Sequence, residues 1–182
     1  PQHFQTYQDE IDYLVSHKGR NNLIKNLVKD IKGNTLVLFN YIEKHGDPLY
    51  ELINSNIDPE RKIFFVHGGT DVEDREEVRQ ITELEDNAVI IASYGTFSTG
   101  INIKRLHNII FASPSKSRIR NLQSIGRVLR KGEGKTLATL YDIADDIGGQ
   151  NYTLKHLNER VNIYNDENFK YEVIKINLRA DT

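Results

Sequence analysis

Five short apolar runs recur along the middle of the chain, and polar or turn residues bound each of them. The runs span residues 35–39, 62–66, 88–92, 108–112 and 136–141. Their apolar side chains follow one another without alternation, which is typical of strands that are covered on both faces. Spacings of roughly 20 to 28 residues leave room for crossover helices between consecutive runs. The pattern predicts an α/β fold in which helices sandwich a parallel sheet.

Apolar residues at helical spacing occur before and between these runs. Residues 7–31 show this spacing in two segments that break near 17–19, and Gly33 with Asn34 follows the second segment. A glycine just past a helix is a common terminator, so two helices should precede the first strand. Residues 48–54 predict a further helix between the first two strands.

Local signals also mark the later connections. Thr70 and Glu73 have the spacing of a capping box, which predicts that Thr70 caps an acidic helix. Beyond Gly148, residues 152–164 show helical spacing and residues 171–178 alternate as in a strand. We therefore divide the chain into a helical lead-in, an α/β lobe and a docked helix–strand extension. Their boundaries are residues 1–33, 34–148 and 149–182.

Composition narrows the class of protein. Apolar residues make up 38% of the 182 residues and charged residues 27%, as in a folded soluble domain. No apolar stretch is long enough to span a membrane, and the N-terminus lacks the apolar core of a secretory signal. The absence of cysteine excludes disulfides and thiolate chemistry and is compatible with a cytoplasmic protein. The six histidines are scattered without metal-ligand spacing, so we expect no metal site.

The net charge of −2 hides two oppositely charged regions. Residues 71–86 contain eight acidic and two basic residues, whereas residues 104–135 contain nine basic residues and one acidic residue. A charge run is usually a solvated surface. The basic run is nevertheless the part of the chain that would attract nucleic acid.

Small and polar residues follow each predicted strand. Because parallel strands end at the same edge of a sheet, and ligands bind beyond that edge, these residues should gather there. Backbone groups and hydroxyls in such turns suit phosphates or a polynucleotide backbone. The residues are Asn40, His67, Gly68, Gly69, Thr70, Ser93, Tyr94, Gly95, Thr96, Ser113, Pro114, Ser115 and Asp142.

Residues 116–131 predict an amphipathic helix in the basic run. At 100° per residue, one polar stripe contains Lys116, Arg120, Gln123, Arg127 and Arg130. Arg127 and Arg130 project side by side on this stripe, and guanidinium groups match phosphate oxygens as planar forks. The stripe is therefore a candidate receptor for a phosphoryl group.

Several segments resemble the motifs of superfamily 2 helicases. Residues 123–130, QSIGRVLR, resemble motif VI, and residues 93–103, SYGTFSTGINI, resemble motif V. Residues 35–40 resemble motif IV, and His67-Gly68 resembles the adjoining turn. The resemblance spans about residues 34 to 145 and implies the second RecA-like lobe of an ATP-driven motor.

The resemblance also implies roles for individual residues. Arg130 would be an arginine finger on the γ-phosphate of ATP and Arg127 its partner, with Gln123, Gly100 and Asn102 near the nucleotide. The nucleic-acid contacts would be Asn40, His67, Gly68, Ser93, Thr96, Lys116 and Arg120, where Ser93 and Thr96 compete for one backbone contact. The expected partners are branched or partly single-stranded DNA, RNA–DNA hybrids and an N-terminal RecA-like lobe.

The chain lacks the other half of an ATP site. Gly134-Lys135-Thr136 matches only the end of a phosphate-binding loop, because Leu129 stands where the first glycine is needed. No acidic pair that could hold Mg²⁺ directly follows a predicted strand. We therefore expect the N-terminal lobe to hold most of the Mg²⁺–ATP, and the isolated chain to be inactive. Two alternatives are a non-catalytic nucleic-acid-binding module and a small nucleotide-binding regulator.

Overall fold

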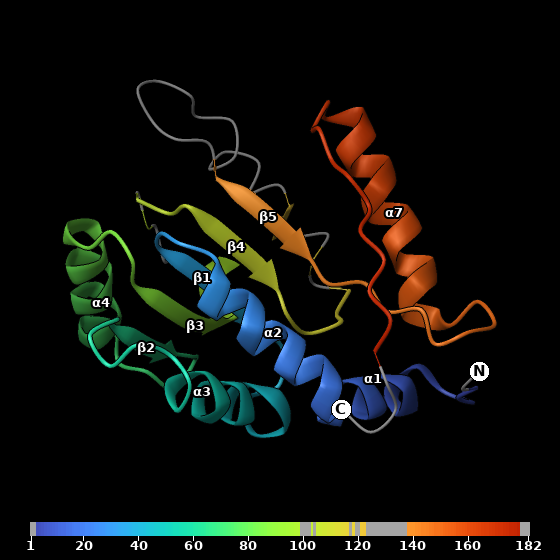
Figure 1. Cartoon of the computed structure of the whole chain (residues 1–182), viewed down its shortest axis with the longest axis horizontal. Helices are drawn as coiled ribbons and strands as arrows, with labels where there is room; N and C mark the ends of the chain where they lie inside the picture. Colours follow the sequence, from blue (N-terminus) through green and yellow to red (C-terminus); the bar gives the residue numbers. More distant parts are fainter. Residues whose placement is uncertain are drawn as a thin grey trace.

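The computed structural model describes residues 3–98, 103, 105–116, 118, 121–122 and 138–178. In this part of the chain, five strands form one sheet in the order β2-β3-β1-β4-β5, and all neighbouring strands are parallel (Figure 1). The strands are β1 (Thr35–Phe39), β2 (Ile63–Val66), β3 (Val89–Ser93), β4 (Asn108–Phe111) and β5 (Thr139–Asp142). The structure confirms the predicted fold class, and a strand is present at each of the five continuous apolar runs.

Alternating strand residues face the two covered sides of the sheet, because successive side chains in a strand point to opposite faces. Val37 and Phe39 of β1 pack with Ile24 and Val28, whereas Leu36 joins the core on the other side. The first side is covered by helices α2 (Lys18–Asp30) and α3 (Asp47–Asn54). Core residues on the second side come from α5 (Tyr94–Ser98) and α7 (Tyr152–Asp166), and α4 (Val72–Leu84) packs against it.

The two predicted N-terminal helices are present as α1 (Tyr7–Ser16) and α2. His17 separates them, with extended backbone and an Nδ1 atom that accepts a hydrogen bond from the Arg20 N–H. Gly33 follows α2 at a φ of +106°, where a Cβ atom would lie 2.8 Å from the Cβ atom of His107. Only glycine fits there. A π-helix, η1 (Ile42–Gly46), precedes α3 and lengthens the predicted helix toward its N-terminus.

The capping box predicted at Thr70 is wrong. Helix α4 begins at Val72 with Asp71 in the N-cap position, and no side chain caps it. The Thr70 hydroxyl instead accepts a hydrogen bond from the backbone N–H of His67. Thr70 therefore closes the turn after β2 and does not open the helix.

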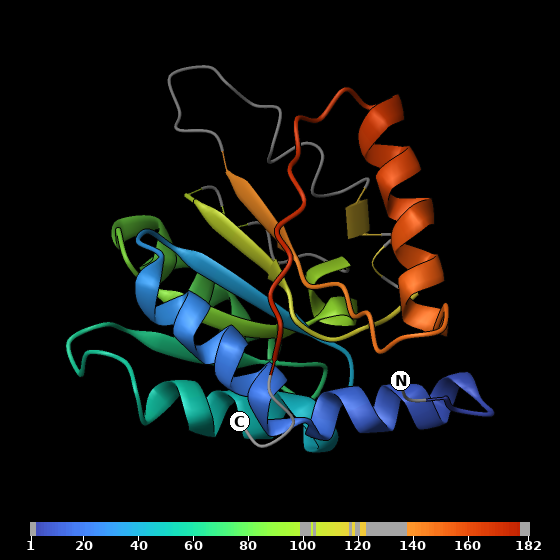
Figure 2. The ribbon, with the colours of Figure 1, turned by 45° about the vertical axis from the view of Figure 1, so that its right-hand side comes forward.

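The predicted C-terminal strand is also wrong. Residues 169–178 are extended but pair with no strand of the described part of the chain. They run back from the end of α7 (Figures 1 and 2). Phe169 packs against the core, but the apolar side chains of residues 171–178 are exposed. The segment therefore has the alternating pattern of a strand, but it does not pair with the sheet.

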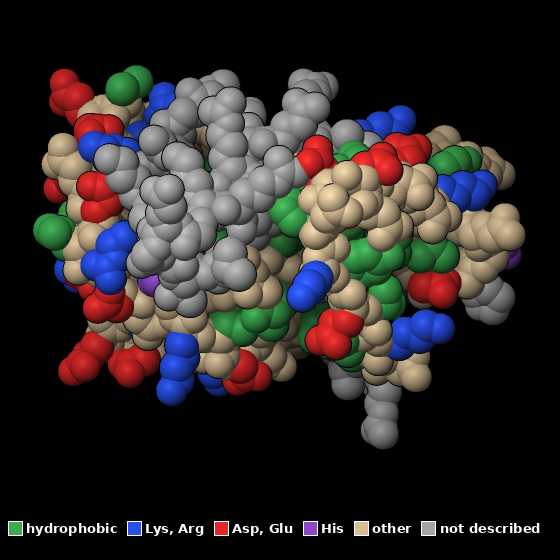
Figure 3. Space-filling view, turned by 90° about the horizontal axis from the view of Figure 1, so that it is seen from above, with side chains coloured by type: hydrophobic (Ala, Val, Ile, Leu, Met, Phe, Trp, Pro, Cys, Tyr) green, Lys and Arg blue, Asp and Glu red, His purple; other side chains and the backbone are tan. Residues whose placement is uncertain are grey.

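Acidic and basic side chains alternate over the end of the molecule that carries α4 (Figure 3). Arg79 forms ion pairs with Glu76 and with Glu83 on the same helix, the second at 2.6 Å, and Arg105 pairs with Asp86. The acidic run is thus partly neutralised on the folded surface. In the described residues, no helix has the length and apolar composition needed to cross a membrane.

Candidate nucleic-acid interface

The carboxyl ends of the five strands meet at one edge, as the parallel arrangement requires. Asn40 follows β1, His67 follows β2, and Ser93 is the last residue of β3. Ser113 lies two residues past β4, and Asp142 ends β5. The structure therefore brings together the polar residues that the sequence placed after the strands.

The turn after β2 presents two glycines at this edge. The Gly69 N–H donates to Nδ1 of His67 at 3.0 Å, so the imidazole is held against its own turn. Gly68 is exposed, and a Cβ atom built on it would meet no atom within 4 Å. The turn leaves space for the close approach of another chain's backbone.

Ser93 and Thr96 form a second turn beside the first. Their hydroxyl oxygens lie 2.6 Å apart, and the Thr96 N–H donates to the Ser93 hydroxyl at 3.2 Å. Ser93 is half-buried, whereas Thr96 is only 4% exposed. Of the two residues that compete for one backbone contact, Ser93 is the one that solvent reaches.

Asn40 is held in place by a chain of hydrogen bonds that the sequence did not reveal. Its backbone N–H donates to the Ser113 hydroxyl, which contacts Nδ1 of His45. Nε2 of His45 lies 2.8 Å from the side-chain oxygen of Asn21 in α2. These partners assign the proton of His45 to Nε2, which donates to Asn21, while Nδ1 accepts from Ser113.

His45 is fully buried in this network. Burial, with the nearby charges of Arg20 and Arg118, lowers the pKa of the His45 imidazole well below its usual range. A protonated ring would also lose the ability to accept from Ser113. His45 is thus a neutral connector between α2 and the ends of β1 and β4.

A cluster of buried charges occupies the other end of the edge. Asp142 accepts hydrogen bonds from Arg118 at 2.9 Å, from Arg160 at 2.7 and 2.9 Å, and from the Tyr164 hydroxyl at 2.6 Å. Burial alone would raise the pKa of the Asp142 carboxyl, but the two guanidinium groups outweigh it and lower that pKa. Asp142 is therefore a carboxylate that joins β5 to helix α7.

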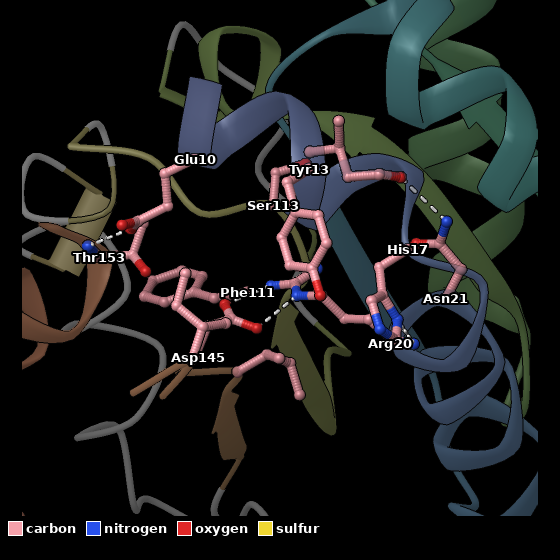
Figure 4. Close-up of polar contacts among 12 residues, drawn as sticks. Glu10, Tyr13, His17, Arg20, Asn21, Phe111, Ser113, Asp145 and Thr153 are labelled. Carbon is pink, nitrogen blue, oxygen red and sulfur yellow. Dashed lines mark hydrogen bonds and ion pairs between the residues drawn. The ribbon is translucent and has the colours of Figure 1, made fainter. Parts of the chain in front are cut away.

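Helix α1 holds the start of α7 beside this cluster, and helix α2 holds the segment between β5 and α7. The Glu10 carboxylate accepts from the backbone N–H groups of Tyr152 and Thr153, at 3.0 and 2.6 Å, and from the Asn151 amide. Figure 4 shows Glu10 pointing toward Thr153. Arg20 forms a bidentate pair with Asp145 at 2.7 and 3.0 Å (Figure 4). A carboxylate at a helix N-terminus satisfies unpaired amides and favours the helix dipole.

Lys116 lies at the rim of this region. Its side chain is exposed, and Nζ stands 5.2 Å from the centre of the Tyr7 ring in α1. Tyr94 and Phe97 are buried, at 2% and 9% exposed, so neither offers a ring on which a base could stack. Among the described candidates, exposed positive charge at this edge comes from Lys116.

The remaining candidates lie outside the described residues. This holds for both expected catalytic arginines and for the expected nucleotide contacts. They are Arg127, Arg130, Gln123, Gly100 and Asn102, and with them the nucleic-acid candidate Arg120. In the described part of the chain, His, Asp and Glu side chains form no group of three that could hold a metal ion.

A family model for the helicase conserved C-terminal domain matches residues 19–132, which is more than half of the chain. The chain belongs to this family. The matched range of this helicase domain includes every residue for which the resemblance implied a role in binding nucleotide or nucleic acid. The five-stranded parallel sheet is accordingly the RecA-like fold of helicase C-terminal lobes.

Similarity to one curated relative extends over nearly the whole chain. The chain is 37% identical over 190 aligned positions to the ATP-dependent DNA helicase uvsW of Enterobacteria phage T4. The alignment covers 96% of this chain but only 37% of that relative. The chain thus spans little more than a third of the length of the relative it matches.

Solved structures show the same fold. The crystal structure of T4 UvsW superposes with a TM-score of 0.72 at 36% identity, covering 90% of this chain and 35% of that one. The C-terminal part of the Fun30 ATPase domain matches with a TM-score of 0.55 at 22% identity, over 72% of this chain and 43% of that one. The E. coli DEAD-box protein SrmB matches at 0.52 and 18%, over 70% of this chain and 72% of that one.

Proposed function

We propose that this chain is the second motor lobe of an ATP-dependent superfamily 2 DNA helicase. The observation that carries the proposal is the 37% identity, over 96% of the chain, to a protein named as an ATP-dependent DNA helicase. An N-terminal RecA-like lobe would bind most of the Mg²⁺–ATP, and this lobe would close on it. Closure on ATP and opening after hydrolysis would step the two lobes along a strand.

The proposed catalytic contribution of the chain is positive charge. Arg130 would contact the γ-phosphate as an arginine finger, and Arg127 would contact the phosphates or acidic groups of the other lobe. Both guanidinium groups would stabilise the negative charge that develops during hydrolysis. Gln123, Gly100 and Asn102 would lie near the nucleotide. We assign no metal-dependent step to the described residues.

The proposed nucleic-acid contacts lie along the carboxyl edge of the sheet. The open turn at Gly68, the half-buried His67 and the Ser93 hydroxyl support a path across the ends of β2 and β3. Ser93 is favoured over Thr96 because Thr96 is nearly buried and bonded to Ser93. Asn40, Lys116 and Arg120 would extend this path past β1 and β4.

The proposed contacts along the carboxyl edge bind the phosphate backbone of the nucleic acid and not the edges of its bases. We therefore expect binding with little sequence preference and with affinity that falls steeply as salt rises. Branched or partly single-stranded DNA and RNA–DNA hybrids are the proposed substrates. Their single strands would lie across both lobes.

The decisive experiment measures DNA-stimulated ATP hydrolysis by the complete two-lobed protein carrying Arg130→Ala. Loss of an arginine finger should lower the turnover number by roughly 10³ or more. Arg105→Ala is the matched control, because Arg105 pairs with Asp86 after α4 and lies away from the carboxyl edge. The control should stay within about twofold of wild type, as exposed ion pairs contribute little.

Hydrolysis within a few-fold of wild type in the Arg130→Ala protein would contradict the proposal. Salt-sensitive DNA binding without any ATPase activity would indicate the non-catalytic binding module. ATP binding by the 182-residue chain alone would indicate the nucleotide-binding regulator. The proposal expects neither behaviour.

A further inference from the structure

Arg118 is a fully buried arginine that binds the carboxyl ends of two strands at once. It is 1% exposed, and its guanidinium group donates to the carbonyl oxygens of Phe111 at 3.0 Å, Ser113 at 2.9 Å and Ile143 at 2.8 Å. It also pairs with Asp142 at 2.9 Å. These bonds fasten the carboxyl ends of β4 and β5 to each other through one side chain.

The same guanidinium group reaches the turn after β3. Its Nε–H lies 3.2 Å from the Tyr94 hydroxyl, and that hydroxyl donates to the Ser113 carbonyl at 2.7 Å. Tyr94 is buried at the start of α5, next to Ser93 in the sequence. The bond therefore ties the Ser93 turn, the proposed backbone contact, to the ends of β4 and β5.

Arg118 also stands close in the sequence to the expected catalytic residues. It precedes Gln123 by five residues and Arg127 by nine. A buried group at this point can link two sites if both of them bias its arrangement. In the sequence, Arg118 lies between the Ser93 turn and the residues expected to contact the nucleotide phosphates, Arg127 and Arg130.

We propose that Tyr94 and Arg118 are positioning residues that couple nucleic-acid contact at the Ser93 turn to ATP hydrolysis. This inference rests on the proposed motor function. Neither residue touches nucleic acid or nucleotide in the proposal. Tyr94 holds the turn at a fixed distance from Arg118, and Arg118 holds the beginning of the segment that carries the two arginines.

The test uses the complete two-lobed protein with Tyr94→Phe, which removes one hydroxyl and keeps the ring against Phe111. ATP hydrolysis is measured with and without a single-stranded oligonucleotide, together with the KM for ATP and the half-saturating oligonucleotide concentration. The DNA-stimulated turnover number should fall about 5- to 30-fold, the size of typical coupling between sites. Both half-saturation values should stay within about twofold of wild type.

Tyr164→Phe is the matched control. Its hydroxyl donates to Asp142 of the same cluster and not to Arg118 or Tyr94. Equal losses in the two variants would show a merely structural role and overturn the inference, as would full stimulation in Tyr94→Phe. Arg118→Lys, which keeps the charge but cannot reach all the carbonyl oxygens, should repeat the Tyr94→Phe effect if it folds.

The wild-type protein separates this inference from the proposed function. Absence of DNA-stimulated hydrolysis in wild type would contradict the motor function itself. Stimulation that Arg130→Ala abolishes and Tyr94→Phe leaves intact would keep the motor function and overturn the coupling.

Discussion

The two halves of the carboxyl edge are built differently. After β2 and β3, the edge consists of short turns with an exposed glycine and half-buried polar side chains at His67 and Ser93. After β4 and β5, it consists of Arg118, Asp142 and Arg160, whose side chains are 2%, 11% and 3% exposed. The first half offers groups to a ligand, whereas the second half bonds almost entirely to itself.

This difference indicates that the open half of the edge contacts ligands, whereas the buried half stabilises the fold. Groups in the open half exchange water for a ligand at small cost. Groups in the buried half cannot leave their partners without exposing an uncompensated charge to a low-dielectric interior. We therefore expect substitutions in the buried half to change the free energy of unfolding, and substitutions in the open half to change binding.

The largest effect should come from Asp142→Asn, which keeps the side-chain shape but removes the charge between two buried guanidinium groups. The free energy of unfolding should fall by about 3–5 kcal/mol in urea titrations of the 182-residue chain. Asp166→Asn, exposed at the end of α7, should change it by less than about 0.5 kcal/mol. Equal stability of the two variants would contradict the division of the edge.

The lowered pKa of Asp142 also predicts how the stability of the chain changes at low pH. The carboxyl group has its pKa lowered in the folded chain, so its contribution to stability is complete above the ordinary pKa of aspartate, about 3.9. The contribution is then lost as the pH falls below that value. The difference between wild type and Asp142→Asn should therefore shrink at about pH 3.

A smaller effect should follow from Glu10→Gln, which loosens α7 from α1. The Glu10 oxygens face donors on both sides, so either orientation of the new amide points its NH₂ group at a donor. The free energy of unfolding should fall by about 2 kcal/mol, the range for a hydrogen bond to a charged group. Asp9→Asn, exposed on the same helix turn, should cost less than about 0.5 kcal/mol. A Glu10→Gln protein as stable as Asp9→Asn would show that α7 needs no such cap.

The sequence predicted the open half of the edge better than the buried half. Continuous apolar runs locate buried strands, and the polar residues just after them must then share an edge. His67, Gly68 and Ser93 were found in this way. The ordering of the strands, by contrast, follows from packing that no local pattern records.

Arg118 was counted only as one basic residue of a charged run, although a signal for its burial exists. At 100° per residue it shares a helix face with Leu122, which is 3% exposed, and lies away from the polar stripe of Lys116. An arginine on an apolar face needs a buried acid. The sequence cannot tell which acid, because Asp142 lies 24 positions further on.

The two wrong predictions have a common cause. Thr70 has the spacing of a helix cap, but its hydroxyl is taken by the His67 N–H in the preceding turn. Residues 171–178 alternate like a strand, but the described part of the chain offers them no strand partner. A local sequence pattern indicates which structure a segment can form. Whether the segment forms it depends on the hydrogen-bond partners that the rest of the fold provides.

A further prediction tests His45, which connects α2 to the strand ends. Between pH 7.5 and 5.5 the unfolded chain binds a proton at this histidine, with an ordinary pKa near 6.5, while the buried ring stays neutral. Stability is therefore complete above about pH 6.5 and falls below it, by about 1.4 kcal/mol at pH 5.5. His45→Gln should lose this part of the pH dependence, whereas the exposed His3→Gln should keep it. Identical slopes for His45→Gln and wild type would exclude a neutral buried imidazole.

The smallest change in stability should come from Gly68→Ala in the open half. Its new Cβ atom meets nothing within 4 Å, so the free energy of unfolding should stay within about 0.5 kcal/mol of wild type. Gly46→Ala is the opposite case, because its Cβ atom would lie 2.6 Å from the Phe39 ring, and overpacking typically costs about 1–3 kcal/mol. In the two-lobed protein, Gly68→Ala should also weaken oligonucleotide binding a few-fold, because the added methyl group keeps a phosphate backbone at a distance. The factor should be the same for different base sequences. Unchanged binding would show that the strand does not pass over this turn, and the proposed path would then have to run from Ser93 past Asn40 alone.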